Sequence, residues 1–384
     1  MKLAELIDRY PGVCLATPDD NADILRFFDA FPMQGKGLHV GYERGPDFFD
    51  FLKMGTPRFF VFLGRFQGTI RGMGTLTLRP GMCEGLKSLV GYFQDLRILT
   101  EPRAALKWRR FYEGLITCAP KIQEFKGCSH FLTSVIDQNQ AAVRSLVEHE
   151  RFDFRYVPAS RYAMVNISAR WPVPAPHRAC EVRRATAADE AALRLFLRAA
   201  NDSRPMGWCF DGSADDQLSW RLAQWKGLGW QNVFLALSAG RILGCTAVWS
   251  PDTSKRVILQ KVPRSYKVYF ALLRHLGGRA PRQGGELKVR YLTTLFLDES
   301  RSLGERRAVF ATLVEDIWRE LHSEDFHSLS FCDFAAAPML PALRRFVTFK
   351  TPMTLYRVGA RSWPEGWDSA PSSPLAPGFE MALV

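Results

Sequence analysis

Short apolar runs rich in β-branched and aromatic residues alternate along this chain with stretches in which apolar residues recur every three or four positions. The first pattern predicts strands, and the second predicts amphipathic helices that bury one face. The first half gives the order strand, helix, three strands, helix, strand, helix and strand, at residues 13–17, 18–30, 58–63, 69–78, 90–98, 102–115, 130–136, 140–148 and 161–167. We therefore expect an α/β protein with a mixed, mostly antiparallel sheet.

The second half of the chain repeats the order of the first. Its predicted elements lie at residues 182–186, 187–199, 233–237, 242–249, 289–297, 303–318, 328–332, 338–346 and 353–358. Thr17 matches Thr186, 169 residues later, and the Gly-x-Ile-x-Gly motif at 68–72 recurs 172 residues later at 240–244. Because the spacing hardly changes, the sequence predicts an internal duplication.

The fourth predicted strand of each half runs directly into a helix. Such a turn directs unpaired backbone N–H groups and the positive end of the helix dipole toward its surroundings. It therefore attracts phosphate, and a phosphate-bearing ligand is expected at one or both turns.

The second half has gained about 27 residues between its third and fourth strands, since Tyr92 matches Tyr291 at a spacing of 199. This insert, residues 251–288, has a predicted helix at 266–276 and no acidic residue between 253 and 285. A solvated face, a clamp for cofactor phosphates and a nucleic-acid surface all fit its charge, and a solvated or domain-bridging structure is expected because Lys and Arg are ordinarily exposed. An RNA surface would be favoured if Tyr266 and Phe270 projected outward for base stacking.

Composition narrows the class of protein. The 384 residues carry a formal net charge of +12, which fits an anionic partner such as nucleic acid, an acidic lipid surface or a phosphorylated cofactor. The eight cysteines and seven histidines show no metal-ligand spacing, so we expect reduced thiols and no metal. The apolar runs are too short to span a bilayer and the first residues lack a signal-peptide core, so we expect a cytoplasmic protein.

The predicted organisation has four parts. They are a first domain (residues 1–168), a proline-rich linker (169–179), a second domain with the basic insert (180–360) and a Pro/Ser-rich tail (361–384). The tail is expected to be irregular, or held only by its tryptophans.

The order of elements, with its turn after the fourth strand, resembles the GCN5-related N-acetyltransferase (GNAT) fold, present here twice in tandem. The resemblance implies two mostly antiparallel sheets with flanking helices, in which the fourth and fifth strands splay apart around the pantetheine arm of acetyl-CoA or another acyl-CoA. It also implies an Arg/Gln-x-x-Gly-x-Gly/Ala turn for the pyrophosphate and an Asn after the fifth strand that contacts the cofactor. A Tyr on the next helix acts as the acid that protonates the leaving thiolate.

The first half matches this pattern in part. Its candidate cofactor-binding residues, by resemblance, are Leu96, Arg97, Ile98, Arg103, Ala104, Lys107 and Asn139. Leu106 and Trp108 stand at the two glycine positions of the turn, where side chains crowd an approaching phosphate. Leu146 stands where the family has its tyrosine acid. A purely structural interpretation is that Asn139 is a turn or capping residue.

The second half departs from the pattern differently. Its candidate cofactor-binding residues are Arg301, Gly304 and Arg306, with Arg306 at the last small position, and it lacks the Asn.

The candidate catalytic residues lie in the first half. Tyr92 stands at the position where the family frequently has a glutamate base, and Asp95 is the nearest carboxylate. A free phenol, with a pKa of about 10, is a poor base at neutral pH. The simpler interpretations are a packing role for Tyr92 and an ion pair of Asp95 with Arg97 or Arg71.

The resemblance implies a CoA-dependent N-acyltransferase that moves an acetyl or similar group to an amine of a small molecule or peptide, by direct attack of the neutral amine. One alternative is tRNA-dependent aminoacyl transfer, which the basic insert favours. Another is a non-catalytic binding or regulatory protein, which the missing glycines and missing acid favour. Binding experiments separate these three functions. Binding of acetyl-CoA supports the N-acyltransferase, salt-sensitive binding of tRNA supports aminoacyl transfer, and binding of neither supports a non-catalytic protein.

Overall fold

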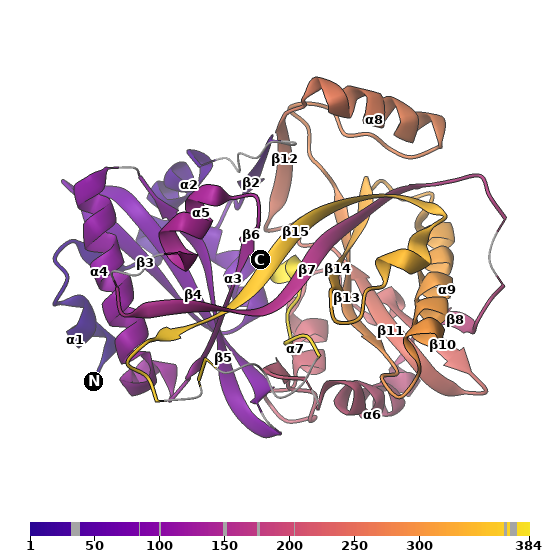
Figure 1. The fold of residues 1–384 in the computed structure, drawn as a ribbon, viewed down its shortest axis with the longest axis horizontal. Helices are drawn as coiled ribbons and strands as arrows, with labels where there is room; N and C mark the ends of the chain where they lie inside the picture. Colours follow the sequence, from indigo (N-terminus) through magenta and orange to yellow (C-terminus); the bar gives the residue numbers. More distant parts are fainter. Residues whose placement is uncertain are drawn as a thin grey trace.

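The first half of the chain folds in the order that its hydrophobic pattern predicts (Figure 1). Its strands are β1 (Val13–Leu15), β2 (His39–Glu43), β3 (Arg58–Phe66), β4 (Thr69–Cys83), β5 (Leu86–Ile98), β6 (His130–Ile136) and β7 (Phe154–Arg170). Its helices are α1 (Leu3–Ile7), α2 (Asn21–Asp29), α3 (Phe48–Gly55), α4 (Pro102–Cys118) and α5 (Gln140–Ala142), which continues as a π-helical turn (Val143–Val147). This computed structural model describes residues 1–31, 39–83, 85–99, 101–148, 152–174, 177–202, 204–364, 367–368 and 375–384.

The second half follows the same plan. Its strands are β8 (Glu181–Arg184), β9 (Gly207–Trp208), β10 (Val233–Ser238), β11 (Arg241–Trp249), β12 (Arg256–Lys261), β13 (Val289–Leu297), β14 (Ser328–Phe334) and β15 (Phe346–Ala360). Its helices are α6 (Glu190–Asn201), α7 (Gln217–Gln224), α8 (Arg264–His275) and α9 (Leu303–Leu321). The helix predicted at 338–346 is wrong: only a 3₁₀ turn forms (Leu340–Leu343), because Pro341 removes a helical donor.

Apart from β2 and β12, the strands of the described residues in both halves join one sheet. Its order is β1-β3-β4-β5-β6-β15-β7-β14-β13-β11-β10-β8, with β9 paired to β4. The predicted class, an α/β protein with a mixed and mostly antiparallel sheet, is confirmed, since among these pairs only β5–β6 and β13–β14 run parallel.

The last strand of each half crosses into the other half. β15, at the end of the second repeat, pairs with β6 of the first, while β7, at the end of the first, pairs with β14 of the second. The two long strands also pair with each other over their whole length, from Phe346 opposite Arg170 to Ala360 opposite Phe154. The sequence did not predict this exchange.

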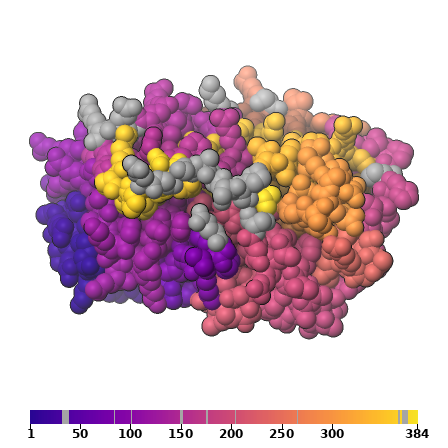
Figure 2. All heavy atoms as spheres, turned by 60° about the horizontal axis from the view of Figure 1, so that its bottom comes forward, coloured from indigo at the N-terminus to yellow at the C-terminus, as the bar shows by residue number. Residues whose placement is uncertain are grey.

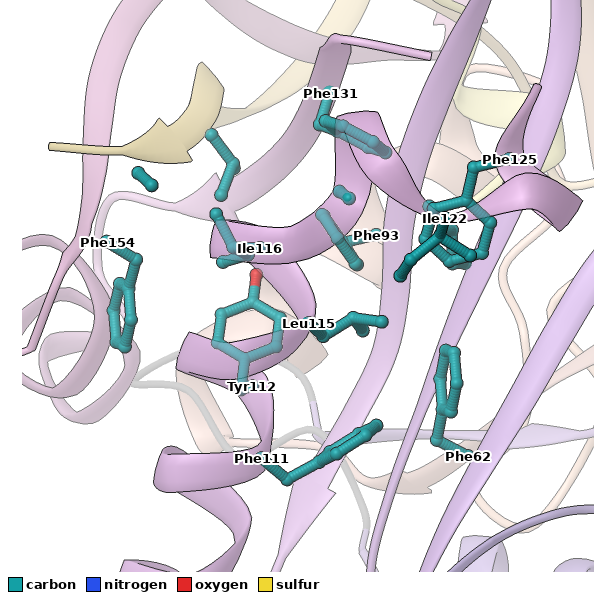
Figure 3. Close-up of a cluster of buried hydrophobic side chains, with 14 of the residues drawn as sticks. Phe62, Phe93, Phe111, Tyr112, Leu115, Ile116, Ile122, Phe125, Phe131 and Phe154 are labelled. Carbon is teal, nitrogen blue, oxygen red and sulfur yellow. The ribbon is translucent and has the colours of Figure 1, made fainter. Parts of the chain in front are cut away.

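The core of the first half lies between α4 and the sheet. Phe111 and Leu115 of α4 point toward Phe62 of β3 and Phe93 of β5 (Figure 3). Tyr112 is also buried there, and its hydroxyl lies 2.7 Å from that of Tyr156. The amphipathic pattern of α4 therefore buries the face that the sequence predicts. In the second half α9 buries Phe310, Leu313 and Ile317 in the same way.

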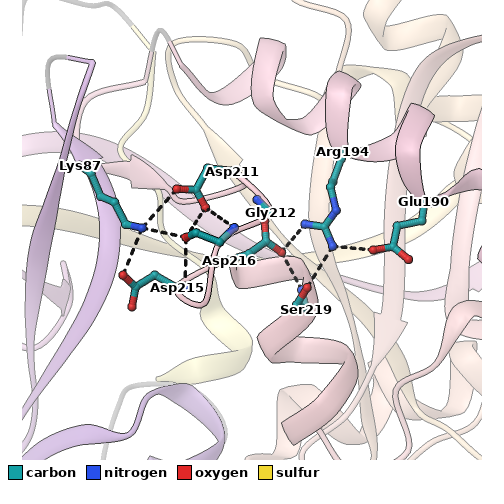
Figure 4. Close-up of polar contacts among 9 residues, drawn as sticks. Lys87, Glu190, Arg194, Asp211, Gly212, Asp215, Asp216 and Ser219 are labelled. Carbon is teal, nitrogen blue, oxygen red and sulfur yellow. Dashed lines mark hydrogen bonds and ion pairs between the residues drawn. The ribbon is translucent and has the colours of Figure 1, made fainter.

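The β4–β5 hairpin is tied to the second half by a cluster of charges (Figure 4). Lys87 Nζ lies 3.2 Å from Asp211 and 3.1 Å from Asp215. Asp216, beside them, caps α7 and pairs with Arg194 of α6 at 2.5 Å. These contacts hold the two halves together at the surface, in addition to the exchanged strands.

The insert forms β12 and α8, and β12 pairs with β2 of the first half in a separate two-stranded sheet. The predicted helix at 266–276 is confirmed as α8. Among the described residues no helix is long and apolar enough to cross a bilayer.

Residues 361–364, 367–368 and 375–384 follow β15, and Figure 2 shows yellow residues from this end of the chain on the surface of the first half. Trp363 packs on the core there, 6.0 Å from Phe131 between ring centroids, which is the tryptophan anchor that the sequence predicts. We call residues 375–384 the C-terminal segment. It is not merely irregular, because Ala376, Phe379 and Ala382 are buried between the halves.

Candidate functional site

In each half two parallel strands pair over a short ladder and then separate, and we call these two points of separation the first and the second cleft. The β5–β6 ladder covers only Val90–Tyr92, although β5 runs on to Ile98. The β13–β14 ladder likewise covers only Val289–Tyr291. The splayed pair of strands that the sequence predicts is therefore present twice.

A β-bulge lies just beyond each point of separation. Asp95 and Leu96 together oppose Gly74, and Thr294 and Leu295 together oppose Thr246. Asp95 and Thr294 have positive φ, 56° and 50°, a region that non-glycine residues seldom adopt. A bulge breaks the ladder locally and re-aims the backbone, so both bulges place main-chain groups at the mouth of a cleft.

The two candidate catalytic residues lie at the first cleft. Tyr92 packs on Phe379 of the C-terminal segment, with ring centroids 5.7 Å apart, and burial raises the pKa of its phenol far above the ordinary value. Asp95 is almost completely buried, and its Oδ1 accepts a hydrogen bond from Arg44 at 3.0 Å. Arg97 Nη1 lies 3.6 Å away from the same oxygen. The geometry at both positions is the simpler one: a packed tyrosine and an ion-paired aspartate.

Among the described residues, Asp95 is the side-chain carboxylate that pairs with the cations of a buried cluster formed by Arg44, Arg97 and Lys255. Phe28 and Phe51 separate the cations: Arg97 lies 3.5 Å from the Phe28 ring, and Arg44 lies 4.0 Å from the Phe51 ring. Burial lowers the pKa of Arg97 to about 10 and also lowers that of Lys255. Lys255 donates to the main-chain oxygen of Val384, which fixes the end of the C-terminal segment beside the first bulge.

The helix after the first cleft is open at its N-terminus. Glu101, the N-cap residue of α4, makes no side-chain capping bond. Arg103 and Lys107 are exposed on the first turns and Ala104 is half-buried, while Leu96, Arg97 and Ile98 form the half-buried end of β5. The unpaired amides and the two cations form a setting that attracts an anion.

The two side chains that replace the glycines of the turn do not fill this cleft. Leu106 is exposed, and Trp108 lies on β3 and β4, where the glycines at 64, 72 and 74 leave room for its ring. β4 lies on the side of β5 away from β6. The side chain of Trp108 therefore packs on the side of β5 away from β6, and the crowding that the sequence predicts does not occur between β5 and β6.

Asn139 has a local role in the structure. Its Oδ1 accepts a hydrogen bond from the backbone N–H of Ala142 at 3.1 Å and so caps α5. The capping interpretation of this residue fits, and its contact with a cofactor stays a prediction.

The second cleft carries its own carboxylates at both anion positions. Ser302 and Glu305 form a reciprocal capping box at the start of α9, where Gly304 has open space around its Cα. Arg301 lies 3.1 Å from Glu305, and Arg306 pairs with Glu299. The candidate cations Arg301 and Arg306 thus already have partners.

Glu380 of the C-terminal segment occupies the second bulge. Its Oε1 accepts hydrogen bonds from the backbone N–H of Thr294 at 2.7 Å and from the buried Arg221 at 2.8 Å. Its Oε2 is buried and has no hydrogen-bond partner among the described residues. Sequence reasoning missed Glu380, because a single carboxylate in a tail rich in Pro and Ser carries no local signal.

Two cavities meet at the C-terminal segment. One, of about 110 Å³, lies between β13, β14 and this segment, with Arg204, Glu299 and Arg306 in its lining. The other, of about 50 Å³, is lined by Tyr92 and Gln94 of β5 and by Val384. Glu380 lines both. Among the described residues no group of three or more His, Cys, Asp or Glu side chains is placed to hold a metal ion.

Solved structures share this fold. Saccharomyces cerevisiae N-myristoyltransferase with bound myristoyl-CoA superposes with a TM-score of 0.57 at 9% identity, over 92% of this chain and 84% of that one. A GCN5-related N-acetyltransferase from Sphaerobacter thermophilus gives a TM-score of 0.53 at 12% identity, over 96% and 97%. No family model matches the sequence, and no curated protein matches it.

The fold and the two splayed clefts define the class: the chain has the GNAT fold, as the resemblance in its sequence predicts. At these identities the likeness establishes the architecture alone.

Proposed function

We propose that the protein is an acyl-CoA-dependent N-acyltransferase whose acyl-CoA site is the first cleft. The observation that carries this proposal is the combination of the bulge at Asp95 and Leu96 with the uncapped N-terminus of α4. The structural neighbours support the use of a CoA thioester, since one is named as an N-acetyltransferase and the other contains myristoyl-CoA. Acetyl-CoA is the simplest thioester donor of this kind.

The first cleft is the better candidate because its anion positions are not filled by the chain itself. In the second half, Glu305 caps α9 and Glu380 binds the bulge amide. In the second cleft a pyrophosphate would have to displace Glu305, and a thioester carbonyl would have to displace Glu380. We therefore assign the second half a supporting role, which is to hold the C-terminal segment between the two clefts.

The residues of the first cleft fit an acyl-CoA. The amides at the start of α4, with Arg103 and Lys107, would hold the phosphates. Main-chain groups of Leu96–Ile98 would orient the pantetheine arm, and Trp108 stays outside the cleft. The bound thioester supplies an activated acyl carbon for attack by an amine.

The acceptor amine is expected in the cavities beside the C-terminal segment. Arg221 and Thr294 fix one oxygen of Glu380, and the unpartnered Oε2 is available to bind an ammonium group and take its proton. Tyr92 and Asp95 are unsuited to this step, because the first is buried and protonated and the second is paired with Arg44. We propose a cytoplasmic location, which fits cysteines that form no disulfide among the described residues.

A thermal-shift titration with acetyl-CoA, myristoyl-CoA and free CoA tests the donor. A ligand at a hundred times its Kd adds about 2.7 kcal/mol to the free energy of unfolding, so a thioester that binds should raise Tm by several degrees. Replacing both Arg103 and Lys107 by Ala should reduce this shift. Arg110→Ala, an exposed arginine further along α4, is the matched control and should leave it unchanged. Equal shifts for the control and the double variant would place the donor elsewhere.

The Glu380→Gln variant tests the proton acceptor. With an amine that the wild type acylates, kcat should fall by about 10²-fold or more. Binding of the donor, measured by the same thermal shift, should persist. If kcat is unchanged, Glu380 is only an anchor for the C-terminal segment.

A further inference from the structure

Helix α8 in the insert stands at the periphery of the molecule, away from both clefts (Figure 1). One face is anchored: Phe270 and Leu273 are buried, and they pack with Leu259 of β12, Ala169 and Val347. Because these contacts come from β12, β7 and β15, the helix is held firmly on the body of the protein. Its other face therefore presents a fixed surface.

The outer face of α8 is apolar at its centre and cationic around it. Val268 is 73% exposed and Leu272 is 38% exposed, one turn apart on the same side. Their exposed cationic neighbours are Lys261, Arg264, Lys267 and Arg274. None of these four cations forms an ion pair with a described residue, and the chain from 253 to 285 contains no carboxylate.

We propose that this face of α8, centred on Val268 and Leu272, docks the protein on an anionic lipid surface. An interfacial helix of this kind inserts its aliphatic side chains at the headgroup boundary while Lys and Arg bind anionic headgroups. The charged side chains named on this face are all cationic, so their charge complements that of anionic headgroups. The docking surface is separate from the acyl-transfer site and does not depend on it.

The aromatic residues of the insert favour lipid over nucleic acid. Binding of RNA by stacking requires exposed rings. Phe270 is only 6% exposed, and the ring of Tyr266 packs against Phe349 at 5.8 Å and against Tyr269 and Phe270 at 6.4 Å. The exposed apolar side chains at the centre of the α8 face, Val268 and Leu272, are aliphatic and offer no ring on which a base can stack. Phe349 of β15 is 37% exposed, but its ring packs against Tyr266. The outward projection of Tyr266 and Phe270 that would favour an RNA surface is therefore not seen.

A comparison within the chain shows that exposure of one leucine is not sufficient. Leu195 on α6 is 72% exposed, yet the arginines beside it are paired: Arg194 with Glu190 and Asp216, and Arg198 with Asp202. α6 therefore has no excess of free cations to draw it to an anionic surface. It provides the control.

Sedimentation of the full chain with vesicles tests the proposal. Vesicles of phosphatidylcholine alone are compared with vesicles in which a third of the lipid is phosphatidylglycerol. The wild type should bind the anionic vesicles only, and salt should weaken the binding. Lys267→Gln with Arg274→Gln should reduce the partition coefficient by about fivefold for each charge removed. Val268→Ser with Leu272→Ser should reduce it by about tenfold or more, because both insert apolar surface.

Leu195→Ser should leave vesicle binding unchanged, and all variants should retain the thermal unfolding transition of the wild type, since the altered side chains are exposed. Equal binding to neutral and anionic vesicles, or none to either, would overturn the proposal. So would an equal loss of binding in Leu195→Ser. Salt-sensitive binding of tRNA that Val268→Ser and Leu272→Ser leave intact, without vesicle binding, would assign the cations to nucleic acid instead.

Discussion

The position of Asp95 in the chain suggests a catalytic role, whereas its contacts in the structure indicate a structural one. It lies at the bulge of the first cleft, with positive φ, where the sequence suggests a base. Its carboxylate is enclosed with Arg44 and Arg97, at 7% exposure. Its Oδ1 accepts a hydrogen bond from Arg44 at 3.0 Å, so this oxygen is already occupied within the protein. Its main effect is to neutralise buried positive charge.

Replacing Asp95 by Ala should therefore lower the free energy of unfolding by about 3–5 kcal/mol, because Arg44 is left buried without a counter-ion. Urea denaturation followed by circular dichroism measures the change. Asp23→Ala removes an exposed carboxylate that pairs with Arg26, and it should cost less than about 1 kcal/mol. Similar losses for the two variants would show that the buried cluster is not coupled as described.

Asp20 and Asp189 stand at corresponding positions in the two halves, each as the third helical residue of a capping box. Each accepts hydrogen bonds from the backbone N–H and the hydroxyl of a threonine three residues earlier, Thr17 and Thr186. Arg183 pairs with Asp189 at 2.6 Å and, together with the Thr186 amide, lowers the pKa of Asp189 below its ordinary value of 3.8. The Thr17 amide is the main cause that lowers the pKa of Asp20.

These lowered pKa values predict a loss of stability in acid. The native state keeps both carboxylates ionised to lower pH than the unfolded chain does, so their contribution is complete above pH 4 and is lost as the pH falls below it. Asp189→Asn should cost about 1 kcal/mol at pH 7 and clearly less at pH 2, where part of the contribution has been lost. Unfolding curves at both pH values measure the difference. A cost that does not change with pH would assign the effect to packing.

At the scale of the element, α4 shows why a helix can depart from the GNAT turn pattern and still leave its cleft open. Leu106 and Trp108 lie two positions apart on the helix, so they point in different directions. Trp108 faces β3 and β4, where a Cβ at Gly64, Gly72 or Gly74 would lie 3.1–3.2 Å from the indole. The three glycines and the tryptophan form one packing unit.

Trp108→Ala should destabilise the protein by about 3–5 kcal/mol, because the glycines opposite cannot fill the space that the indole leaves. Leu106→Ala, in the same helix but 45% exposed, should change the free energy of unfolding by less than about 0.5 kcal/mol. Thermal unfolding of the two variants measures the contrast. A small effect at Trp108 would indicate that α4 can repack on the sheet.

At the scale of the whole molecule, the exchange of β7 and β15 makes each half depend on the other. β6 of the first half takes its outer partner from the second half, and β14 of the second half takes its partner from the first. If either half were made alone, a long strand and the edge that receives its partner would both be exposed. Exposed edges of this kind promote aggregation.

Residues 1–174 produced alone should therefore aggregate or stay unfolded. The same piece produced together with residues 175–384 should form a soluble complex, since the exchanged strands supply the missing partners. Size-exclusion chromatography and circular dichroism measure both outcomes. A monomeric, cooperatively folded first half would contradict the dependence.

Local pattern was enough for much of the fold and for part of the site. The apolar periodicity placed most of the helices and strands of the two halves, and the shared order of strand, turn and helix aligned Tyr92 with Tyr291 across a spacing of 199. These features follow from the preferences of neighbouring residues, which act over a few positions and can be read directly from the chain. The helix expected at 338–346 failed because proline overrides apolar periodicity.

The tertiary structure alone decided which strand completes which half, the pairing of β2 with β12, and the insertion of Glu380 at the second bulge. Each joins residues that are distant in sequence: Glu380 meets Thr294 across 86 positions, and Lys87 meets Asp211 across 124. The edge of β6 offers the same backbone groups to any strand, so its pattern cannot state a choice between β7 and β15. That choice depends on how the whole chain packs, and no local sequence signal records it.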